Sequence, residues 1–441
     1  MERKRIVCQG SIPEFEHDGD EMDRYYLPGR GLVLSGSRHL LPDHQMMIDY
    51  AHQFNNILSQ LGLMPRNVGF IPDSHYLLDE AILENLQIMK RDLSSPGDYL
   101  VYPYAVTENL LRWCGELKNL GLSIESMFPK KIYFEDLDHP SHRGGWGRWV
   151  DEPERLSFPE EANLPYPTSW IGRNLEEIVE AYYRVCQETK TPSAVIKPIF
   201  SAGGFTLKIV NNEEDLRKYY QKLNYERALD LFNEKIPIEV QSFVPDITAF
   251  YSLQYLKGIL ITPGKVCQQI IKETSWQGNL FNLHTWNHNS YQIEMVLEQA
   301  SEIWQNFSQF YPDIENEWGG LDLALTSEGR LIILEHNGQR ITGAIPAIAA
   351  ASQLGVKDSP FATLKSPANP ACDLKALWDF LCTENFAYDS SKKEGVFPIV
   401  WLPGSGMLLA VSDNPIKLLE RVYSQLQKLG YLKTDEKRPN N

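Results

Sequence analysis

The chain has 441 residues, and its 42 lysines and arginines against 58 aspartates and glutamates give a formal net charge of −16 with histidine neutral. Proteins that bind duplex nucleic acid or anionic membranes usually present a basic face, so this balance argues against both partners. The six scattered cysteines form no C-x-x-C pair, and no apolar run approaches the roughly 18 residues of a membrane-spanning helix. We therefore expect a cytoplasmic protein with reduced thiols, long enough for about three domains.

The N-terminal region alternates short apolar runs with segments of helical periodicity. Strands are expected at 31–34, 68–71 and 99–102, and helices at 43–61, 78–93 and 107–120. Asp43 is placed to cap the first helix, and Gly62 suits the position just after its end. This alternation indicates a layered α/β domain with a parallel sheet, and the lack of G-x-G-x-x-G after the first strand argues against a dinucleotide site.

Residues 136–170 are rich in proline, glycine, histidine and tryptophan without a clear period, which is typical of a domain boundary or a long functional loop. Within them, the side chains of 139–149 suit substrate recognition and interdomain packing equally well. Capped helices are then expected from Asn174 and Asn212. Further strands are expected at 194–199, 205–210, 237–244, 249–256, 259–262, 266–272, 396–401 and 407–411, and helices at 292–310, 344–351, 373–381 and 416–429.

The segment 319–340 has the pattern of two strands joined by a tight turn. If residues 328–329 form a two-residue loop, Asp322 lies directly opposite Glu335, with Cβ atoms about 5 Å apart. Asn337, two residues farther along, lies on the same face. Opposed carboxylates repel unless a cation lies between them, and carboxylate and amide oxygens are the ligands that Mg²⁺ prefers. The hairpin therefore predicts a magnesium site, provided that its register does not slip by one residue.

An ordinary hairpin with a solvated polar face is the alternative interpretation of these carboxylates. The apolar run Leu331–Leu334 favours the metal site, because a buried strand makes an unpaired Glu335 at its end costly. Arg340, just beyond the strand, offers a planar cation suited to phosphate or carboxylate.

Lys197 interrupts an otherwise apolar strand and is followed by a loop of small residues. In this loop, Ser201, Gly203 and Gly204 bring backbone N–H groups that suit phosphate oxygens at close approach, while the lysine adds a point charge. An ordinary edge hairpin has the same pattern and is the alternative. Together with the carboxylate hairpin, however, the loop favours a nucleoside triphosphate as the ligand.

The order of these motifs, over about residues 170–350, resembles that of the ATP-grasp superfamily of carboxylate–amine ligases. In that family the strand lysine and the glycine loop hold the phosphates of ATP, so the resemblance implies this role for Lys197 and the loop that follows it. It likewise implies that Asp322, Glu335 and Asn337 bind Mg²⁺.

The segment 240–244 resembles the hinge that hydrogen-bonds adenine in the same family. The resemblance implies that Gln241, where the family usually has glutamate, and Val244 contact the base. It also implies that Asp246 binds the ribose.

Two further cations are candidates for the chemistry. Arg340 stands one position later than the arginine of the family's E-x-N-x-R pattern, which leaves open its implied role of offsetting charge on the transferred phosphoryl group. Lys272 is a candidate for contact with the γ-phosphate, and an exposed structural lysine is the alternative.

The resemblance implies an α/β fold with an α+β body. We expect a layered pre-ATP-grasp domain at 1–135, an ATP-grasp body at 136–365 with a lid at about 170–245 and a metal hairpin at about 319–340, and a small α/β cap at 366–441. The N-terminal layout and the segment Pro28–Gly31 also resemble peptide ligases of secondary metabolism.

The activity that the resemblance implies is ATP-dependent and Mg²⁺-dependent joining of a small-molecule carboxylate to an amine through an acylphosphate. A homodimer is a candidate assembly, and the sequence leaves the oligomeric state open. A nucleotide-binding regulatory or scaffold protein of the same fold is the alternative. Phosphoryl transfer to a protein ranks last, because the sequence has no H-R-D catalytic loop. A zinc site at His284 and His288 is disfavoured, since no third ligand lies nearby in the sequence.

Overall fold

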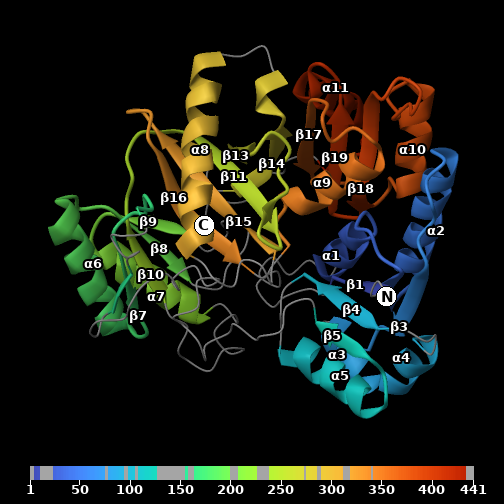
Figure 1. Ribbon diagram of the computed structural model, residues 1–441, viewed down its shortest axis with the longest axis horizontal. Coiled ribbons are helices and arrows are strands. Elements are labelled where there is room, and N and C mark those ends of the chain that lie inside the picture. Colours follow the sequence, from blue (N-terminus) through green and yellow to red (C-terminus); the bar gives the residue numbers. More distant parts are fainter. Residues whose placement is uncertain are drawn as a thin grey trace.

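Among the residues that the computed structural model describes, three β-sheets organise the chain (Figure 1). A small antiparallel sheet lies at the left of the view, a large one in the centre, and a parallel N-terminal sheet at the lower right. The described residues are 4–9, 23–74, 78–93, 98–104, 108–126, 154–156, 163–198, 207–225, 238–272, 275–285, 290–310, 318–338 and 341–433.

The N-terminal elements form the layered parallel domain that the alternating pattern predicts. The sheet has the order β3-β2-β1-β4-β5, and every described pairing in it is parallel. Its strands are β1 (Lys4–Cys8), β2 (Arg38–Asp43), β3 (Val68–Pro72), β4 (Tyr99–Pro103) and β5 (Ile124–Ser126). The helices are α1 (Asp23–Gly31), α2 (Gln45–Gln60), α3 (Leu78–Glu84), α4 (Leu86–Asp92) and α5 (Glu108–Asn119).

The predicted strand at 31–34 is wrong. Helix α1 ends at Gly31, and the amides of the next three residues donate to the carbonyls of Gly29, Arg30 and Gly31 in a turn. The apolar run is buried, as expected, but by packing at a helix end rather than inside a sheet. A short apolar run is compatible with either environment, so its periodicity alone cannot distinguish them.

The cap predicted for α2 is also one residue off. Asp43 ends β2, and His44 is the N-cap, with its Nδ1 accepting a hydrogen bond from the amide of Met46 at 3.3 Å. Gly62, just after the helix, has a φ of +70°, the left-handed conformation expected of glycine at that position.

The smaller antiparallel sheet has the order β6-β7-β10-β8-β9. Its strands are β6 (Glu154–Leu156), β7 (Ser169–Gly172), β8 (Ala194–Pro198), β9 (Lys208–Val210) and β10 (Ile238–Ser242). Helices α6 (Leu175–Thr189) and α7 (Glu213–Tyr225) lie beside it in Figure 1 and share a hydrophobic core with its strands.

Helix α6 begins at the predicted cap, and this cap provides a stability test. The Oδ1 atom of Asn174 accepts a hydrogen bond from the amide of Glu177 at 3.0 Å. We expect Asn174→Ala to lower the free energy of unfolding by about 1 kcal/mol, because the amide loses its acceptor. Urea denaturation measures the change, with the exposed Gln187→Ala in the same helix as the control. Equal losses from both variants would contradict a capping role.

The large sheet is antiparallel and runs in the order β16-β15-β11-β13-β14-β17-β19-β18, with β12 paired to β11. Its strands are β11 (Ile247–Leu256), β12 (Ile259–Leu260), β13 (Cys267–Lys272), β14 (Ser275–Phe281), β15 (Trp318–Thr326), β16 (Leu331–Gly338), β17 (Phe361–Ser366), β18 (Gly395–Leu402) and β19 (Ser405–Val411). The adjoining helices are the 3₁₀ helix η4 (Leu283–Thr285), α8 (Ser290–Phe310), α9 (Ala344–Gln353), α10 (Leu374–Thr383) and α11 (Pro415–Lys428). No helix among those described is long and apolar enough to cross a membrane.

Two strands of this sheet, β14 and β17, were not expected from the sequence pattern. They connect the strands of the body to β18 and β19, so one sheet continues across the predicted domain border at residue 366. Gly278 on β14 shows how closely they approach, because a Cβ added there would lie 2.0 Å from the carbonyl oxygen of Thr363 on β17.

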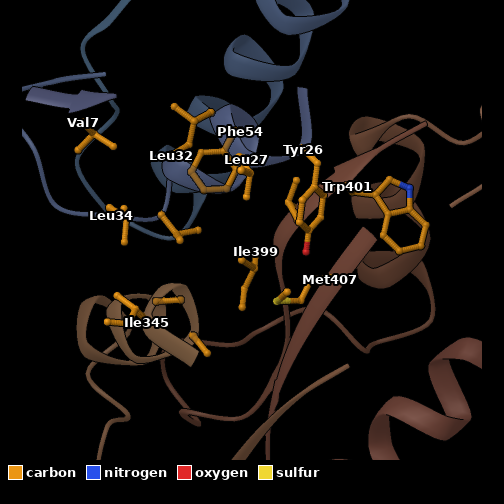
Figure 2. Close-up of a cluster of buried hydrophobic side chains, with 14 of the residues drawn as sticks. Val7, Tyr26, Leu27, Leu32, Leu34, Phe54, Ile345, Ile399, Trp401 and Met407 are labelled. Carbon is orange, nitrogen blue, oxygen red and sulfur yellow. The ribbon is translucent and has the colours of Figure 1, made fainter. Parts of the chain in front are cut away.

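The N-terminal domain and the C-terminal strands share one hydrophobic core. Figure 2 shows Tyr26 of α1 beside Ile399 and Met407, which come from β18 and β19. The ring of Phe54 on α2 lies 6.0 Å from that of Phe397 on β18, in an edge-to-face arrangement. The two ends of the chain therefore stabilise each other, although hundreds of residues separate them.

Candidate active site

Both antiparallel sheets and the N-terminal domain line a cavity of about 490 Å³. Residues predicted for nucleotide and metal binding that line it are Lys197, Gln241, Val244, Asp246, Asp322, Glu335 and Asn337. Other predicted residues lie outside the described part of the chain, and these are Ser201, Gly203, Gly204 and Arg340. Residues 139–149 and His288 lie outside it as well. Lys272 is exposed at the end of β13 and is not among the described residues that line the cavity.

The β15–β16 hairpin brings two carboxylates together, because Asp322 pairs directly with Glu335. This is the predicted pairing, yet the turn that leads to it is longer than the predicted two-residue loop. The amide of Thr326 donates to the carbonyl of Arg330 at 2.9 Å, which leaves a three-residue loop. Gly329, with a φ of +79°, provides the left-handed residue that such a loop needs.

A β-bulge corrects the register before the carboxylates are reached. Beyond Leu323, which pairs with Ile333, the extra residue Leu334 on β16 has no partner on β15. The longer turn and the bulge shift the register in opposite directions, so both carboxylates stay on the cavity face. The carbonyl of Leu334 accepts hydrogen bonds from Lys197 Nζ at 3.2 Å and Gln241 Nε2 at 3.3 Å, which ties the hairpin to β8 and β10.

Neighbouring amides hold the carboxylate of Asp322. Gln269 Nε2 donates to its Oδ1 at 2.6 Å, and Asn337 Nδ2 donates to its Oδ2 at 2.9 Å. Because Asn337 uses its nitrogen on the aspartate, its oxygen is the atom that it offers to a ligand. Burial, reinforced by the nearby Asp322 charge, raises the pKa of the Cys267 thiol above its usual range.

Lys197 on β8 and Gln241 on β10 belong to a buried polar network in the cavity wall. Lys197 Nζ donates to Gln241 Oε1 at 2.6 Å, and Gln241 Nε2 donates to Glu239 Oε1 at 3.1 Å. The hydroxyl of Tyr166 donates to the same Glu239 oxygen at 2.8 Å, and burial together with the Glu239 charge raises the pKa of Tyr166 well above its usual range. Only 4% of the Lys197 residue is exposed. The network therefore fixes its ammonium group at the cavity wall.

Residues 243–246 connect β10 of the smaller sheet to β11 of the large sheet. Phe243, Val244 and Asp246 in this connection line the cavity. Asp246 has a φ of +57°, a left-handed conformation that aspartate tolerates better than most residues. Its carbonyl accepts a hydrogen bond from the amide of Ser327 at 2.9 Å, so the connection also contacts the loop of the carboxylate hairpin.

No family model and no curated protein match the sequence, but solved structures match the fold along nearly its whole length. Biotin carboxylase from Campylobacter jejuni, in a β,γ-ATP complex, has a TM-score of 0.53 at 10% identity and covers 98% of this chain and 92% of its own. The biotin carboxylase domain of Hydrogenobacter thermophilus 2-oxoglutarate carboxylase, with MgADP, ADP and bicarbonate, has a TM-score of 0.53 at 13% identity. The match covers 97% of this chain and 90% of that domain. Carboxyaminoimidazole ribonucleotide synthase from Aspergillus clavatus, complexed with ATP, has a TM-score of 0.50 at 11% identity. The match covers 97% of this chain and 99% of the synthase.

These neighbours are ATP-grasp enzymes. The chain has the ATP-grasp fold. The fold predicted from the ordered motifs is thus confirmed, including the layered α/β domain that precedes the ATP-grasp body. The likeness to peptide ligases stays a prediction.

The donor atoms on one wall of this cavity fit a hard divalent cation. Two carboxylates, from Asp322 and Glu335, and the amide of Asn337 line one wall of the cavity. Within the described ranges, no group of three or more His, Cys, Asp or Glu side chains is placed to hold a metal ion. A set made only of carboxylate and amide oxygens matches Mg²⁺ better than Zn²⁺, which prefers nitrogen and sulfur ligands.

Residues that the sequence pattern did not predict also line the cavity. They include Arg30 on α1, Gln269 on β13, Trp276 and Asn279 on β14, and Lys365 on β17. A signal for Arg30 was present, since it is a lone charge between apolar residues in LPGRGLVL. No comparable signal marked the others, because two of their three strands were not predicted.

Proposed function

We propose that the protein is an ATP-dependent ligase that activates a carboxylate as an acylphosphate and joins it to an amine, as peptide ligases do. The observation that supports this most strongly is the opposed pair Asp322 and Glu335 on the wall of a cavity that Lys197 also lines. Facing carboxylates destabilise a sheet unless a cation lies between them. With Mg²⁺ bound they become a centre for phosphate groups, and the fold neighbours from C. jejuni, H. thermophilus and A. clavatus were solved with nucleotides.

The cavity has the size and lining that a nucleotide needs. Its volume of about 490 Å³ lies within the range of small-molecule sites, which is about 300–1,000 Å³. Apolar side chains such as Val195, Ile209 and Leu334 line it next to the connection between the two sheets. We assign the adenine to this end, with Gln241 and Val244 at the base and Asp246 at the ribose.

The proposed chemistry requires positioning and charge compensation rather than a protein nucleophile. Asp322, Glu335 and Asn337 would hold Mg²⁺, which when bound neutralises charge on the β- and γ-phosphates. The substrate carboxylate attacks the γ-phosphorus and ADP leaves. The amine then attacks the acyl carbon and loses a proton, the amide bond forms and inorganic phosphate leaves. Lys197 offsets charge on the departing ADP, and the enclosing walls keep water from the acylphosphate.

Measurement of ADP release from MgATP with paired panels of amino acids, as acid and amine, tests this proposal. We expect release that requires both partners, with an amide-linked product detected by mass spectrometry. Nucleotide binding without ADP release across the panel would contradict the ligase assignment and indicate a regulatory or scaffold protein. ADP release without a joined product would contradict it as well.

Gln269→Ala tests whether Gln269 orients the Asp322 carboxylate for metal binding. The substitution removes the donor 2.6 Å from Asp322 Oδ1, so the carboxylate loses its orientation. Losing a hydrogen-bond partner of a metal ligand typically weakens metal affinity by about 10–100-fold, and we expect a shift of this size in the Mg²⁺ concentration for half-maximal ADP release. Gln268→Ala is the matched control, because successive side chains of a strand point to opposite faces. An equal Mg²⁺ dependence in both variants would contradict this role.

A further inference from the structure

Arg30 is a buried cation with two guanidinium nitrogens that have no hydrogen-bond partner within the described structure. Only 4% of the residue is exposed, and its Nε and Nη2 atoms find no hydrogen-bond partner among the described residues. The guanidinium group lies 5.6 Å from the ring centroid of Tyr26 and 5.5 Å from that of Tyr104. These rings orient the plane of the group but accept no conventional hydrogen bond. Buried donors of a charged group that lack partners among the described residues are costly, so Arg30 requires an explanation beyond packing.

The two unpartnered atoms of Arg30 lie on one edge of the guanidinium plane. An arginine edge presents two parallel N–H groups, which match the two oxygens of a carboxylate. Arg30 lines the cavity of the proposed active site. Its donors are thus available to an anionic group of a molecule bound there.

A second unpartnered donor lies in the same cavity, on Asn279. This residue is 1% exposed, and its Nδ2 atom has no hydrogen-bond partner among the described residues. The orientation of its amide is fixed, because Trp276 Nε1 donates to Asn279 Oδ1 at 3.3 Å, and an indole nitrogen can only donate. Asn279 therefore presents a donor rather than an acceptor to a ligand.

Aromatic contacts join these donors to a second positive charge. Lys365 Nζ lies 4.9 Å from the ring centroid of Trp276 and 5.8 Å from that of Tyr26, the ring that also faces Arg30. The residues Thr342 to Ala344, at the N-terminus of α9, line the cavity too and add the positive end of a helix dipole. The cluster formed by Arg30, Asn279 and Lys365 is called the cationic subsite below.

The strands that carry Asn279 and Lys365 are offset from the strand that carries Asp322. In the strand order, β14 is three steps and β17 four steps from β15, which carries Asp322. At about 4.8 Å per step, these strands lie about 14 and 19 Å from it. The acidic residues among the described lining are Asp246, Asp322 and Glu335, and all belong to the nucleotide and metal end. An anion at the subsite therefore meets positive charge, while the reacting carboxylate lies near the metal ligands.

We propose that the cationic subsite binds a carboxylate that is not activated, so that the amine substrate is an amino acid or a peptide with a free carboxyl group. This assignment rests on the proposed ligase function. Arg30 holds the carboxylate through its two edge N–H groups, Asn279 donates a further hydrogen bond, and Lys365 adds charge. The aromatic rings of Tyr26, Tyr104 and Trp276 exclude water, which strengthens these contacts.

Thermal unfolding of the full-length protein with acid and amide probes tests the subsite. The probes are standard L-amino acids, L-alanyl-L-alanine, the C-terminal amide of each, and inorganic phosphate, all with saturating MgADP. We expect at least one acid to raise the unfolding midpoint of the wild type while its amide has little effect. Arg30→Gln should lose this preference, with affinity for the acid lowered by on the order of 100-fold. Arg30→Lys should retain part of it, since it keeps the charge but not the paired donors.

Arg112→Gln, at an exposed position of α5 in the same domain, is the matched control and should behave as the wild type. Without ligand, we expect Arg30→Gln to unfold at a higher temperature than the wild type, because it removes a buried charge that has two unsatisfied donors among the described residues. A lower temperature would assign Arg30 a structural role and overturn the proposal. Equal binding of acid and amide by the wild type, unchanged preference in Arg30→Gln, or a response to phosphate alone would also overturn it.

The same samples distinguish failure of the subsite from failure of the ligase assignment. An acid-specific shift that depends on Arg30, without ADP release from any substrate pair, supports the subsite and contradicts the ligase. ADP release that is equally fast with acids and amides as amine substrates supports the ligase and overturns the subsite.

Discussion

Asp322→Asn and Glu335→Gln are each expected to lower the rate of ADP release by on the order of 10³-fold while the fold stays intact. Each substitution removes one of two directly opposed negative charges and preserves the shape of the side chain. The repulsion between the two is lost as well, so we expect the nucleotide-free protein to unfold at a higher temperature and MgADP to stabilise it less. Steady-state ADP release and thermal unfolding with and without MgADP measure these effects.

Glu328→Gln is the control for both variants, because it removes a carboxylate from the loop of the same hairpin. The Glu328 side chain is 70% exposed and forms a surface ion pair with Arg330 at 2.6 Å. Exposed pairs of this kind contribute little, so ADP release and stability should stay close to wild type. Wild-type rates from folded Asp322→Asn or Glu335→Gln protein would reject the assignment of these residues to a metal site.

Phe54→Ala is expected to lower the free energy of unfolding by about 3–5 kcal/mol and to loosen both ends of the chain together. Phe54 is completely buried on α2, and its ring packs against that of Phe397 on β18. The cavity that the substitution creates therefore borders N-terminal and C-terminal elements alike. Urea denaturation measures the loss, and hydrogen exchange should become faster in β1 and in β19 by similar factors.

Asn56→Ala, at an exposed position of the same helix, is the control and should change stability by less than about 0.5 kcal/mol. If Phe54→Ala accelerates exchange only in the parallel sheet, the N-terminal domain unfolds independently, and the idea of a shared cooperative core is wrong.

The carboxylate hairpin shows what the sequence can specify. A two-residue loop at 328–329 predicted that Asp322 faces Glu335, and the structure has this pairing because the bulge compensates for a loop that is one residue longer. Because a one-residue slip would move a strand's side chains to the opposite face, a longer loop without the bulge would have separated the two carboxylates. The bulge at Leu334 could not be predicted, since this residue is as apolar as the three residues that precede it in the strand.

The cationic subsite shows why part of the site was not predictable. Arg30 lies in the last turn of a helix that was not expected, and Asn279 lies on a strand whose sequence, SWQGNLF, lacks the alternation of an ordinary half-buried strand. One face of this strand lines the cavity, so polar residues occupy positions that a core would fill with apolar ones. The identity of such residues depends on contacts between segments that are distant in the sequence, so a local sequence pattern does not predict them.

The shared core has a consequence for synthesis of the protein on the ribosome. The last strand of the parallel sheet, β5, ends at Ser126, whereas β19, which helps to cover the same core, ends at Val411. At about 5–20 residues per second, the interval between them is roughly 15 to 60 s. During this time the apolar face of the nascent N-terminal domain stays uncovered, because the C-terminal strands that pack on it have not been synthesised. A chaperone that shields this face would raise the yield of folded chains.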